Sequence, residues 1–390
     1  MAWATPQYKP EEVNAAARKL ASLEFPVFGD EDLNTLSVIN NWRSAHAYPL
    51  NTFQITLRNR ARKIERDVII AQRSKRLDSI HRKLTSKNSM RMTQMQDIAG
   101  CRAVFSKLKN VYKLVAEYKA SRFDHKFRNE KDYISSPKPD GYRCYHLVYE
   151  YRGTRAETNP YNGLRVEVQI RTQMQHAWAT AVEAVGIFTK QALKSNQGDK
   201  DWLRFFSLMS AAFAALEGTP PVPDTPTDKA GLIKEITDLA SYLNVKKMLQ
   251  VYNSTITTLG SAQDEKYFIV EMNPENLMVT IRRYKAKQSE EANRVYTELE
   301  SKIPDDSSSQ VVLVSVENIN ALKRAYPNYF LDTNNFNKLV DKVLKGEIPE
   351  PIAPGSFIPE GTEKSPSKGG SSKSVHGEKP QIFIQTTLPF

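Results

Sequence analysis

The sequence predicts an α+β fold in which a β-sheet is flanked by helices, and two neighbouring segments carry this prediction. Residues 164–172 alternate between apolar and polar side chains without exception, the period of two that is typical of a strand with one buried face. Residues 173–188 then place apolar side chains three and four positions apart, the spacing of a helix with a buried stripe. The apolar strand positions are Leu164, Val166, Val168 and Ile170, and the helical stripe is Met174, Ala177, Trp178, Ala181, Val182 and Val185.

The composition favours two or three domains and an anionic partner. The chain has 390 residues, of which 40% are hydrophobic, enough for separate cores. A net charge of +11 suits a nucleotide or a nucleic acid. Two cysteines are too few for a disulfide framework, the six histidines lack zinc-ligand spacing, and no stretch is long enough to span a membrane. We therefore expect a cytoplasmic protein without membrane contact.

The first part of the chain, from about residue 11 to residue 84, is expected to be helical, with one helix over 11–23 and an interruption at Pro49. Within it, residues 58–87 carry eleven lysines and arginines against three carboxylates. A run of charges is ordinarily a solvated helix face. Its single sign also suits a polyphosphate, because each charge-assisted contact adds to the next.

Two short motifs follow in the middle of the chain. Asp97 precedes a strand that is entered through Gly100, where an aspartate is ordinarily a cap or turn residue. Pro139-Asp140-Gly141 predicts a turn, since proline presets one dihedral angle and glycine accepts a positive φ. We expect this turn to project Tyr142, either as a platform for a base or as an ordinary structural tyrosine. The elements expected around these motifs are a helix over 107–121 and strands over 123–127 and 146–152.

The polar face of the strand over 164–172 sets Glu167 between Arg165 and Arg171. A solvated strand face tolerates such residues. A carboxylate there can also bind a metal or accept a proton, and the arginines can hold phosphate oxygens. His176 and Glu183 lie off the apolar stripe of the next helix, and their spacing favours a solvated pair over a border of the site.

A proline-rich segment from residue 218 to residue 226 is the clearest boundary in the chain. We expect a first domain over 1–217 and a linker with connecting helices over 218–264, broken near Asn244. A small α/β domain is expected over 265–350 and a disordered tail over 351–390. The small domain is predicted to contain a hairpin of 267–272 and 277–284, a strand over 310–316, and helices over 290–302, 316–326 and 332–344.

Four segments, in this order, resemble the synthetase domain of the RelA/SpoT alarmone synthetases across roughly residues 50–195. They are Arg73-x-Lys75 with Ser79-Ile80 and Lys83; Asp97-Ile98-Ala99-Gly100-x-Arg102; Lys138-Pro139-Asp140-Gly141-Tyr142-Arg143-x-x-His146; and Glu167-Val168-Gln169-Ile170-Arg171-Thr172 with Trp178. The resemblance implies a mixed β-sheet flanked by helices, distantly like nucleotidyltransferases. It also implies an ATP-dependent pyrophosphokinase that transfers pyrophosphate to a ribose hydroxyl.

The resemblance assigns a role to each matched position. Asp97 and Glu167 would be catalytic and would hold Mg²⁺, with Glu167 also activating the attacking hydroxyl. The ATP-binding residues would be Arg73, Lys75, Ser79, Lys83 and Arg102, with the two arginines around the adenine and the lysines on the phosphates. The acceptor-binding residues would be Lys138, Tyr142, His146 and Gln169, with Tyr142 stacked on the acceptor base. A metal on the phosphates and a carboxylate near the hydroxyl are what phosphoryl transfer requires.

The part of the chain beyond the linker resembles the fused toxin–antitoxin branch of this family, the CapRel-type phage-defence proteins. That resemblance implies a toxin domain that pyrophosphorylates the 3′ CCA end of tRNA and so blocks translation. The C-terminal domain would close the ATP site through a Tyr-x-x-Tyr motif, here Tyr326 and Tyr329, until a phage capsid protein binds it. Two tyrosines at this spacing can instead anchor a helix end.

Two other functions stay open from the sequence. The first is an alarmone synthetase that makes guanosine or adenosine polyphosphates and uses the C-terminal domain as a regulator. The second is a non-catalytic RNA-binding or protein-binding module. The intact set of Asp97, Glu167, Arg73, Lys75 and Tyr142 argues against this second alternative.

Overall fold

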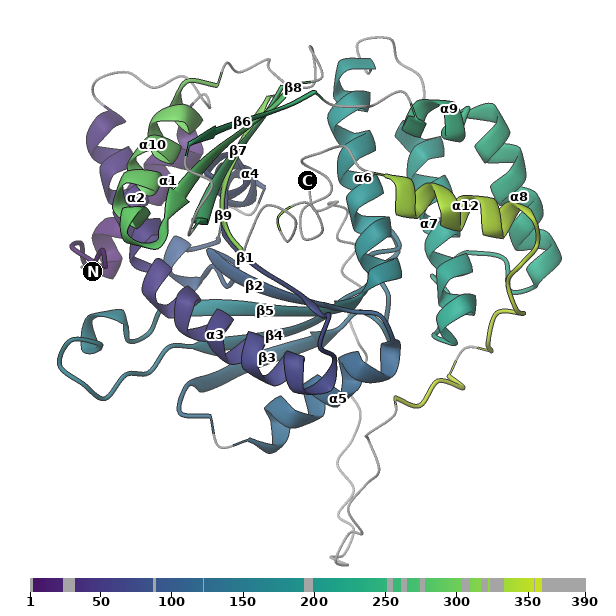
Figure 1. Ribbon diagram of the computed structural model, residues 1–390, viewed down its shortest axis with the longest axis horizontal. Helices are drawn as coiled ribbons and strands as arrows, with labels where there is room; N and C mark the ends of the chain where they lie inside the picture. The colour runs from purple at the N-terminus through teal and green to yellow at the C-terminus, as the bar shows by residue number, and fades with distance from the viewer. Residues whose placement is uncertain are drawn as a thin grey trace, which may run out of the picture.

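The computed structural model describes most of the chain and gives the positions of its helices and strands (Figure 1). The described residues are 3–23, 32–86, 89–121, 123–192, 199–250, 255–260, 265–273, 278–303, 309–316, 322, 333–353 and 355–359. Within these ranges, no helix has the length and apolar character needed to cross a membrane.

The elements follow one another in mixed order, as expected for an α+β fold. The helices are α1 (Pro10–Ser22), α2 (Leu33–Ala45), α3 (Ala47–Ile64), α4 (Leu77–Thr85), α5 (Leu108–Ala120), α6 (Gln173–Ala192), α7 (Asp199–Glu217), α8 (Lys229–Tyr242), α9 (Val245–Gln250), α10 (Ser289–Ser301) and α12 (Asn334–Leu344). The strands are β1 (Ile69–Ser74), β2 (Ala99–Phe105), β3 (Lys126–Asp132), β4 (Tyr145–Glu150), β5 (Arg165–Thr172), β6 (Thr255–Gly260), β7 (Glu265–Asn273), β8 (Met278–Lys285) and β9 (Gln310–Ser315).

All of these strands belong to one sheet, in the order β3-β4-β5-β2-β1-β9-β7-β8-β6. The pairs β5–β2 and β8–β6 are parallel, and the other neighbours are antiparallel. The sheet is therefore mixed and flanked by helices, which confirms the predicted fold class.

The strand over 164–172 has the two faces that its sequence predicts. Val166, Val168 and Ile170 are completely buried in a core that also holds apolar residues of α3, which crosses in front of these strands in Figure 1, and of α5. Burial of these apolar side chains is the main free-energy gain that orients the strand. The alternate residues Glu167 and Gln169 therefore face the opposite side of the sheet, where they remain partly accessible.

A reciprocal cap ends β5 and starts α6. The backbone N–H of Thr172 donates to the Gln175 side chain, and the backbone N–H of Gln175 donates to the Thr172 hydroxyl, each over 3.2 Å. This arrangement satisfies amides that a helix N-terminus leaves unpaired. The apolar stripe of α6 then packs with α7, as predicted, in a second core.

The strands beyond the linker continue the same sheet instead of forming a separate one. β9 pairs with β1 through Gln72 opposite Ser315 and Arg73 opposite Val314. Helix α12 lies elsewhere: Phe336, Val340 and other residues of its apolar face are buried in the core made by α6, α7 and α8. The segment expected as one C-terminal domain is thus distributed over two clusters, at the upper left and the right of Figure 1.

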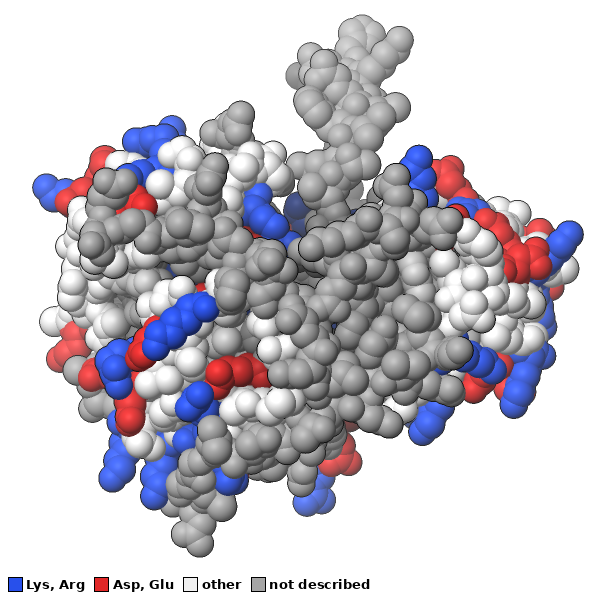
Figure 2. Space-filling model, turned by 90° about the horizontal axis from the view of Figure 1, so that it is seen from above, with Lys and Arg blue, Asp and Glu red and all other residues white. Residues whose placement is uncertain are grey.

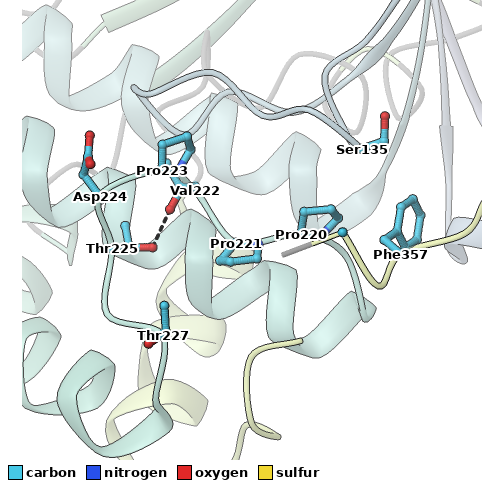
Figure 3. Close-up of a pocket in the computed structure, with 10 residues that line it drawn as sticks. Ser135, Pro220, Pro221, Val222, Pro223, Asp224, Thr225, Thr227 and Phe357 are labelled. Atoms are coloured by element: carbon cyan, nitrogen blue, oxygen red, sulfur yellow. Dashed lines mark hydrogen bonds between the residues drawn. The ribbon is translucent and has the colours of Figure 1, made fainter. Parts of the chain in front are cut away.

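The proline-rich linker has a defined path and borders a shallow pocket of about 330 Å³ (Figure 3). Pro220, Pro223 and Phe357 line it, and the Thr225 hydroxyl donates to the Val222 carbonyl oxygen over 2.6 Å. Its lining residues include one carboxylate, Asp224, and no lysine or arginine, so the pocket is unsuited to a nucleotide polyphosphate. None of the residues predicted to bind ATP or the acceptor lines this pocket.

Three local predictions were wrong. Residues 69–74 form β1, not a helix, because pairing on both sides with β2 and β9 outweighs the local helical pattern. The segment 255–259, expected as helix, is β6, whose β-branched residues pair with β8. Pro49 lies inside the first turn of α3, where the amide that proline lacks has no helical partner, and the break between helices falls at His46. The predicted break at Asn244, with φ of 49°, is confirmed.

The expected basic run does not form one continuous face. Arg60 stacks over the ring of Tyr118 at 4.5 Å, while Lys75 and Lys83 contact Asp97. On the described residues visible in Figure 2, lysines and arginines lie beside aspartates and glutamates over both outer parts of the molecule. The run therefore combines packing residues with residues of the candidate site.

Candidate active site

The strand register brings the predicted site residues into two adjacent rows on the polar face of the sheet. In one row His146, Gln169 and Arg102 are direct neighbours across β4, β5 and β2. In the next row Glu167, Gly100 and Arg73 are neighbours across β5, β2 and β1. Residues as far apart in the chain as Arg73 and Glu167 therefore share one row because the sheet brings these strands side by side.

Within the described part of the chain, Gly100 leaves an open space in the middle of the second row. Among these residues, a Cβ placed on Gly100 would meet only the Glu167 carbonyl oxygen, at 3.9 Å. The space lies between the backbone positions of Glu167 and Arg73, and Arg102 follows Gly100 by two residues on the same face. The sequence predicts Gly100 only as the entry to a strand, whereas the register places it where a ligand can approach the backbone.

Asp97 draws together the two lysines that are predicted to bind phosphates. Its carboxylate accepts hydrogen bonds from Lys75 Nζ and Lys83 Nζ, each over 2.9 Å. Burial alone would raise the pKa of Asp97, but the two ammonium groups outweigh it and hold the pKa well below its ordinary value. Two cations and one carboxylate therefore form a compact, ionised cluster just before β2.

A chain of hydrogen bonds links the residues of the first row to the predicted catalytic carboxylate, Glu167, in the second row. His146 Nδ1 donates to Glu167 over 2.9 Å, and its Nε2 lies 2.9 Å from the Tyr142 hydroxyl. Gln169 Nε2 donates to the other oxygen of Glu167 over 2.7 Å, and Arg102 Nε donates to the oxygen of Gln169 over 3.2 Å. Glu167 is thus oriented from both sides.

The charges along this chain support each other. Burial would lower the pKa of His146, but the oxygens of Tyr142 and Glu167 raise it well above the ordinary value. Burial would likewise raise the pKa of Glu167, but the imidazolium and the Gln169 amide lower it. The two groups therefore favour each other's charged forms, with His146 Nδ1 as the donor and Glu167 as the acceptor.

The donor set fits a magnesium ion shared with a polyphosphate. Glu167 lies beside Gly100 in the register of β5 and β2, and Asp97 precedes Gly100 by three residues. Two carboxylates completed by phosphate oxygens are a usual environment for Mg²⁺. Within the described ranges, no group of three or more histidine, cysteine or acidic side chains could hold a metal by itself. Asp97 and Glu167 would therefore hold an ion only together with its substrate.

The predicted turn before Tyr142 is present and requires glycine. The Gly141 N–H donates to the Lys138 carbonyl oxygen over 2.9 Å, and the Tyr142 N–H donates to Asp140 over 2.8 Å. Gly141 has φ of 92°, and an added Cβ would lie 2.9 Å from Ser210 Cβ. A side chain at this position is excluded both by the backbone conformation and by α7.

Tyr142 does not project from this turn. Its side chain is only 9% exposed, because the ring packs edge-on against His146 and against Tyr133, with centroids 5.8 Å away in each case. The ammonium of Lys138 lies over both tyrosine rings, 4.9 Å from Tyr133 and 5.0 Å from Tyr142. Tyr133 belongs to this aromatic group but carries no recognisable motif in the sequence.

His176 was expected to be solvated, and this was wrong. The residue is 5% exposed, and its Nδ1 accepts a hydrogen bond from the guanidinium of Arg171. Arg171 is itself buried at the end of β5, where burial lowers its pKa to about 10. The helical spacing showed that His176 leaves the apolar stripe, but only the packing of α6 beside β5 gives it a partner.

A buried ion pair joins the segment beyond the linker to the candidate ATP site. The guanidinium of Arg43 on α2 binds Glu300 on α10 over 3.0 Å, and it also donates to the Tyr296 hydroxyl over 2.9 Å. The other oxygen of Glu300 accepts the backbone N–H of Leu77, the first residue of α4, over 2.9 Å. Arg43 Nε donates to the Lys75 carbonyl oxygen over 3.2 Å.

Two groups of predicted residues stay untested by geometry. Ser79 lies on α4, four positions before Lys83 and thus on the same helix face. Tyr326 and Tyr329 lie outside the described residues, as do residues 360–390 of the predicted tail.

The comparison with protein families places this site in a known group. Residues 72–192 match the family model described as "Region found in RelA / SpoT proteins". The chain is 35% identical over 113 residues to the GTP pyrophosphokinase YwaC of Bacillus subtilis, which covers 28% of this chain and 52% of that protein. It is 37% identical over 86 residues to the GTP pyrophosphokinase YjbM of the same organism, which covers 22% and 39%. The chain thus spans about half or less of the curated relatives it matches.

The solved structures similar to this one include the small alarmone synthetase 1 from Bacillus subtilis bound to its product pppGpp. It has 25% identity and a TM-score of 0.38, over 48% of this chain and 94% of that chain. A GTP pyrophosphokinase family protein from Streptococcus pneumoniae has 23% identity and a TM-score of 0.37, over 49% and 91%. The family match includes the candidate site: residues 72–192, which match the region found in RelA/SpoT proteins, contain all the predicted ATP-binding and acceptor-binding residues.

Proposed function

We propose that this protein is an ATP-dependent pyrophosphotransferase that modifies the 3′ CCA end of tRNA and is held inactive by its C-terminal segment. The acceptor hydroxyl oxygen would bond to the β-phosphorus of ATP while the bond between that phosphorus and the α,β-bridging oxygen breaks, so that AMP leaves. The proton of the hydroxyl would pass to Glu167. The single observation that carries the proposal is the convergence of Glu167, Gly100 and the Asp97–lysine cluster on one face of the sheet.

The donor side rests on charge and space. Lys75 and Lys83 are positioned by Asp97 and can turn their ammonium groups to phosphate oxygens. Arg73 and Arg102 flank the open space at Gly100, where the planar guanidinium groups can stack on adenine. A magnesium ion bound with ATP would neutralise charge on the transferred phosphates.

The base is Glu167. An ionised carboxylate oriented by His146 and Gln169 is prepared to accept a proton without rearranging during the reaction. The hydrogen-bonded chain to Tyr142 links the position of the acceptor base to the position of the catalytic carboxylate.

Control by the C-terminal segment is supported by where it attaches. β9 bonds to the backbone of β1 at Arg73, and Glu300 binds the first amide of the helix that carries Lys83. Both contacts touch elements that present ATP-binding residues. A tethered segment acts at an effective concentration of the order of mM, so a modest affinity can compete with ATP. Tyr326 and Tyr329 would complete this inhibition, and a phage capsid protein would be the trigger that releases it.

A second acceptor, a guanine nucleotide, is favoured by one observation. The relatives that match the synthetase domain are named GTP pyrophosphokinases, and one similar solved structure holds pppGpp. On this alternative the protein makes an alarmone, and the same residues perform the same transfer.

The test supplies γ-³²P-labelled ATP with either deacylated tRNA or GTP to the full-length protein and to its Tyr329→Ala variant. We expect label in tRNA, more with the variant than with the wild type, and none with Glu167→Gln in the same background. Label in GTP alone would establish the alarmone alternative. Equal activity of wild type and Tyr329→Ala would contradict the inhibitory role of the tyrosine.

A further inference from the structure

We propose that Tyr133, with Lys131 and Lys138, forms a second nucleotide subsite that binds the base and phosphate preceding the modified nucleotide of a single-stranded acceptor. This inference rests on the proposed tRNA acceptor and adds to it a subsite that a mononucleotide cannot fill. The sequence motifs do not include Tyr133 or Lys131.

Tyr133 is held firmly at the edge of the site. It follows β3 in a turn where Asp132 Oδ1 accepts the backbone N–H groups of Ile134 and Ser135, over 2.9 and 3.0 Å. Its own N–H donates to the Cys144 carbonyl oxygen over 3.1 Å. A rigid backbone lowers the entropy cost of presenting the ring to a ligand.

The ring contacts the residues that are predicted to bind the acceptor. Its centroid lies 5.3 Å from that of His146 and 5.8 Å from that of Tyr142, both in edge-on geometry at interplanar angles of 89° and 72°. Tyr133 is half-buried, whereas Tyr142 is 9% exposed. Because the two rings are nearly perpendicular, bases stacked on them would be splayed apart, the arrangement in which proteins bind single-stranded RNA.

Two ammonium groups lie near this ring. Lys138 Nζ is 4.9 Å from its centroid and Lys131 Nζ is 5.9 Å from it. Lys131 is exposed and is the register partner of His146, so it lies on the polar face of the sheet. Neither lysine forms an ion pair within 4 Å with a carboxylate of the described part of the chain.

Three other lysines are paired with carboxylates. Lys75 and Lys83 bind Asp97, and Lys119 binds Glu130. Lysines over an aromatic ring without a carboxylate partner are suited to a phosphate between stacked bases, since ring stacking and cation contacts together bind single strands. These side chains therefore suit a nucleic-acid strand, and they offer more contacts than a free nucleotide could use.

The experiment measures pyrophosphate transfer by full-length protein, in the wild-type and Tyr329→Ala backgrounds, to deacylated tRNA and to GTP. In each background Tyr133→Ala is compared with Tyr133→Phe, and Lys131→Gln is compared with Lys126→Gln, an exposed lysine at the other end of β3. We expect Tyr133→Ala to raise the KM for tRNA about tenfold or more, and Tyr133→Phe to leave it within about twofold. Lys131→Gln should lower the slope of log(kcat/KM) against log[salt] by about 0.7, and Lys126→Gln should not.

The outcomes separate this inference from the proposed function. An equal loss of kcat for both acceptors in Tyr133→Ala, with unchanged KM for tRNA, means that the ring only supports His146 and overturns the subsite. An unchanged KM and kcat for tRNA in Tyr133→Ala overturns it as well. Label in GTP but never in tRNA, or in no acceptor at all, shows that the proposed acceptor itself is wrong, and the subsite is rejected with it.

Discussion

The carboxylate of Glu300 lies 3.0 Å from the guanidinium of Arg43, although 257 positions separate the two residues in the chain. Both side chains are nearly buried, at 9% and 5% exposure. Glu300 raises the pKa of Arg43, against the effect of burial, and the Tyr296 hydroxyl adds a third partner. The contact ties α10 to α2 and to the start of α4, so it links the C-terminal segment to the lysines of the candidate ATP site.

Removing this ion pair should release the C-terminal segment. In Glu300→Ala, Arg43 stays buried without its charge partner, which typically costs about 3–5 kcal/mol. We expect the full-length variant to transfer pyrophosphate without a trigger, measured as label in the acceptor. Glu298→Ala, on the same helix but half-exposed, should behave as wild type. A folded Glu300→Ala protein with no more transfer activity than the wild type would show that this contact does not inhibit the enzyme.

A larger side chain at Gly100 should block ATP binding while the fold is kept. Among the described residues an added Cβ meets one atom, at 3.9 Å, so Gly100→Ala fits, and Gly100→Val extends into the space that the ligand needs. We expect the KM for ATP to rise more than about tenfold in Gly100→Val, with a smaller change in Gly100→Ala. Thermal denaturation controls for folding. Normal ATP use by a stable Gly100→Val protein would remove Gly100 from the donor site.

Adding a methyl group to Gly141 should destabilise the protein by more than the positive φ of this residue alone would predict. Gly141 and Gly163 have nearly equal φ angles, 92° and 93°, but only at Gly141 would a Cβ meet other atoms, at 2.9 Å. Gly163→Ala should cost about 1–2 kcal/mol and Gly141→Ala about 2–4 kcal/mol, since overpacking adds to backbone strain. Urea denaturation of the two variants measures the difference. Equal losses would mean that α7 can move away from the turn.

The free energy of unfolding should fall between pH 6.5 and pH 4 because of His46. Burial lowers the pKa of His46 to about 4, although the ring bonds to the Trp42 carbonyl oxygen. Above pH 6.5 the imidazole is neutral in both states. Below pH 6.5 the unfolded chain binds a proton at this histidine and the folded protein does not. The free energy of unfolding therefore decreases as the pH falls, by roughly 3 kcal/mol in all.

This prediction is tested by measuring urea denaturation midpoints at several pH values for the wild type and for His46→Gln. The glutamine side chain can still donate to the Trp42 carbonyl oxygen. The variant should lack this part of the pH dependence. The same slope in both proteins would mean that other groups control the acid sensitivity.

The hydrophobic pattern predicted much of the fold, but it missed β1. The alternation around Glu167, the stripe on α6 and the hairpin of β7 and β8 each bury one face of their own segment, so local spacing is sufficient to predict them. Residues 69–74 have no such pattern, since burial does not alternate along β1. Arg73 therefore appeared as a helical residue until its neighbours were known.

Some residues of the candidate site could also be predicted from the sequence, and others could not. Motifs indicated Asp97, Glu167 and Tyr142, because their chemistry recurs in fixed short segments. No local feature distinguishes Tyr133, Arg43 or Glu300, whose partners lie far away in the chain. Burial also reversed two expectations, since Tyr142 is enclosed by aromatic residues and His176 is bonded to Arg171.

The sequence by itself determined which segments form helices and strands over most of the chain, and which residues can perform phosphoryl chemistry. These properties depend on the period of side chains along a backbone and on the chemical groups themselves. Only the tertiary structure decided that the C-terminal strands extend the catalytic sheet, and that Glu300 reaches the first turn of α4. Such contacts form when distant segments bury their surfaces together, and no single segment determines the free energy of that burial.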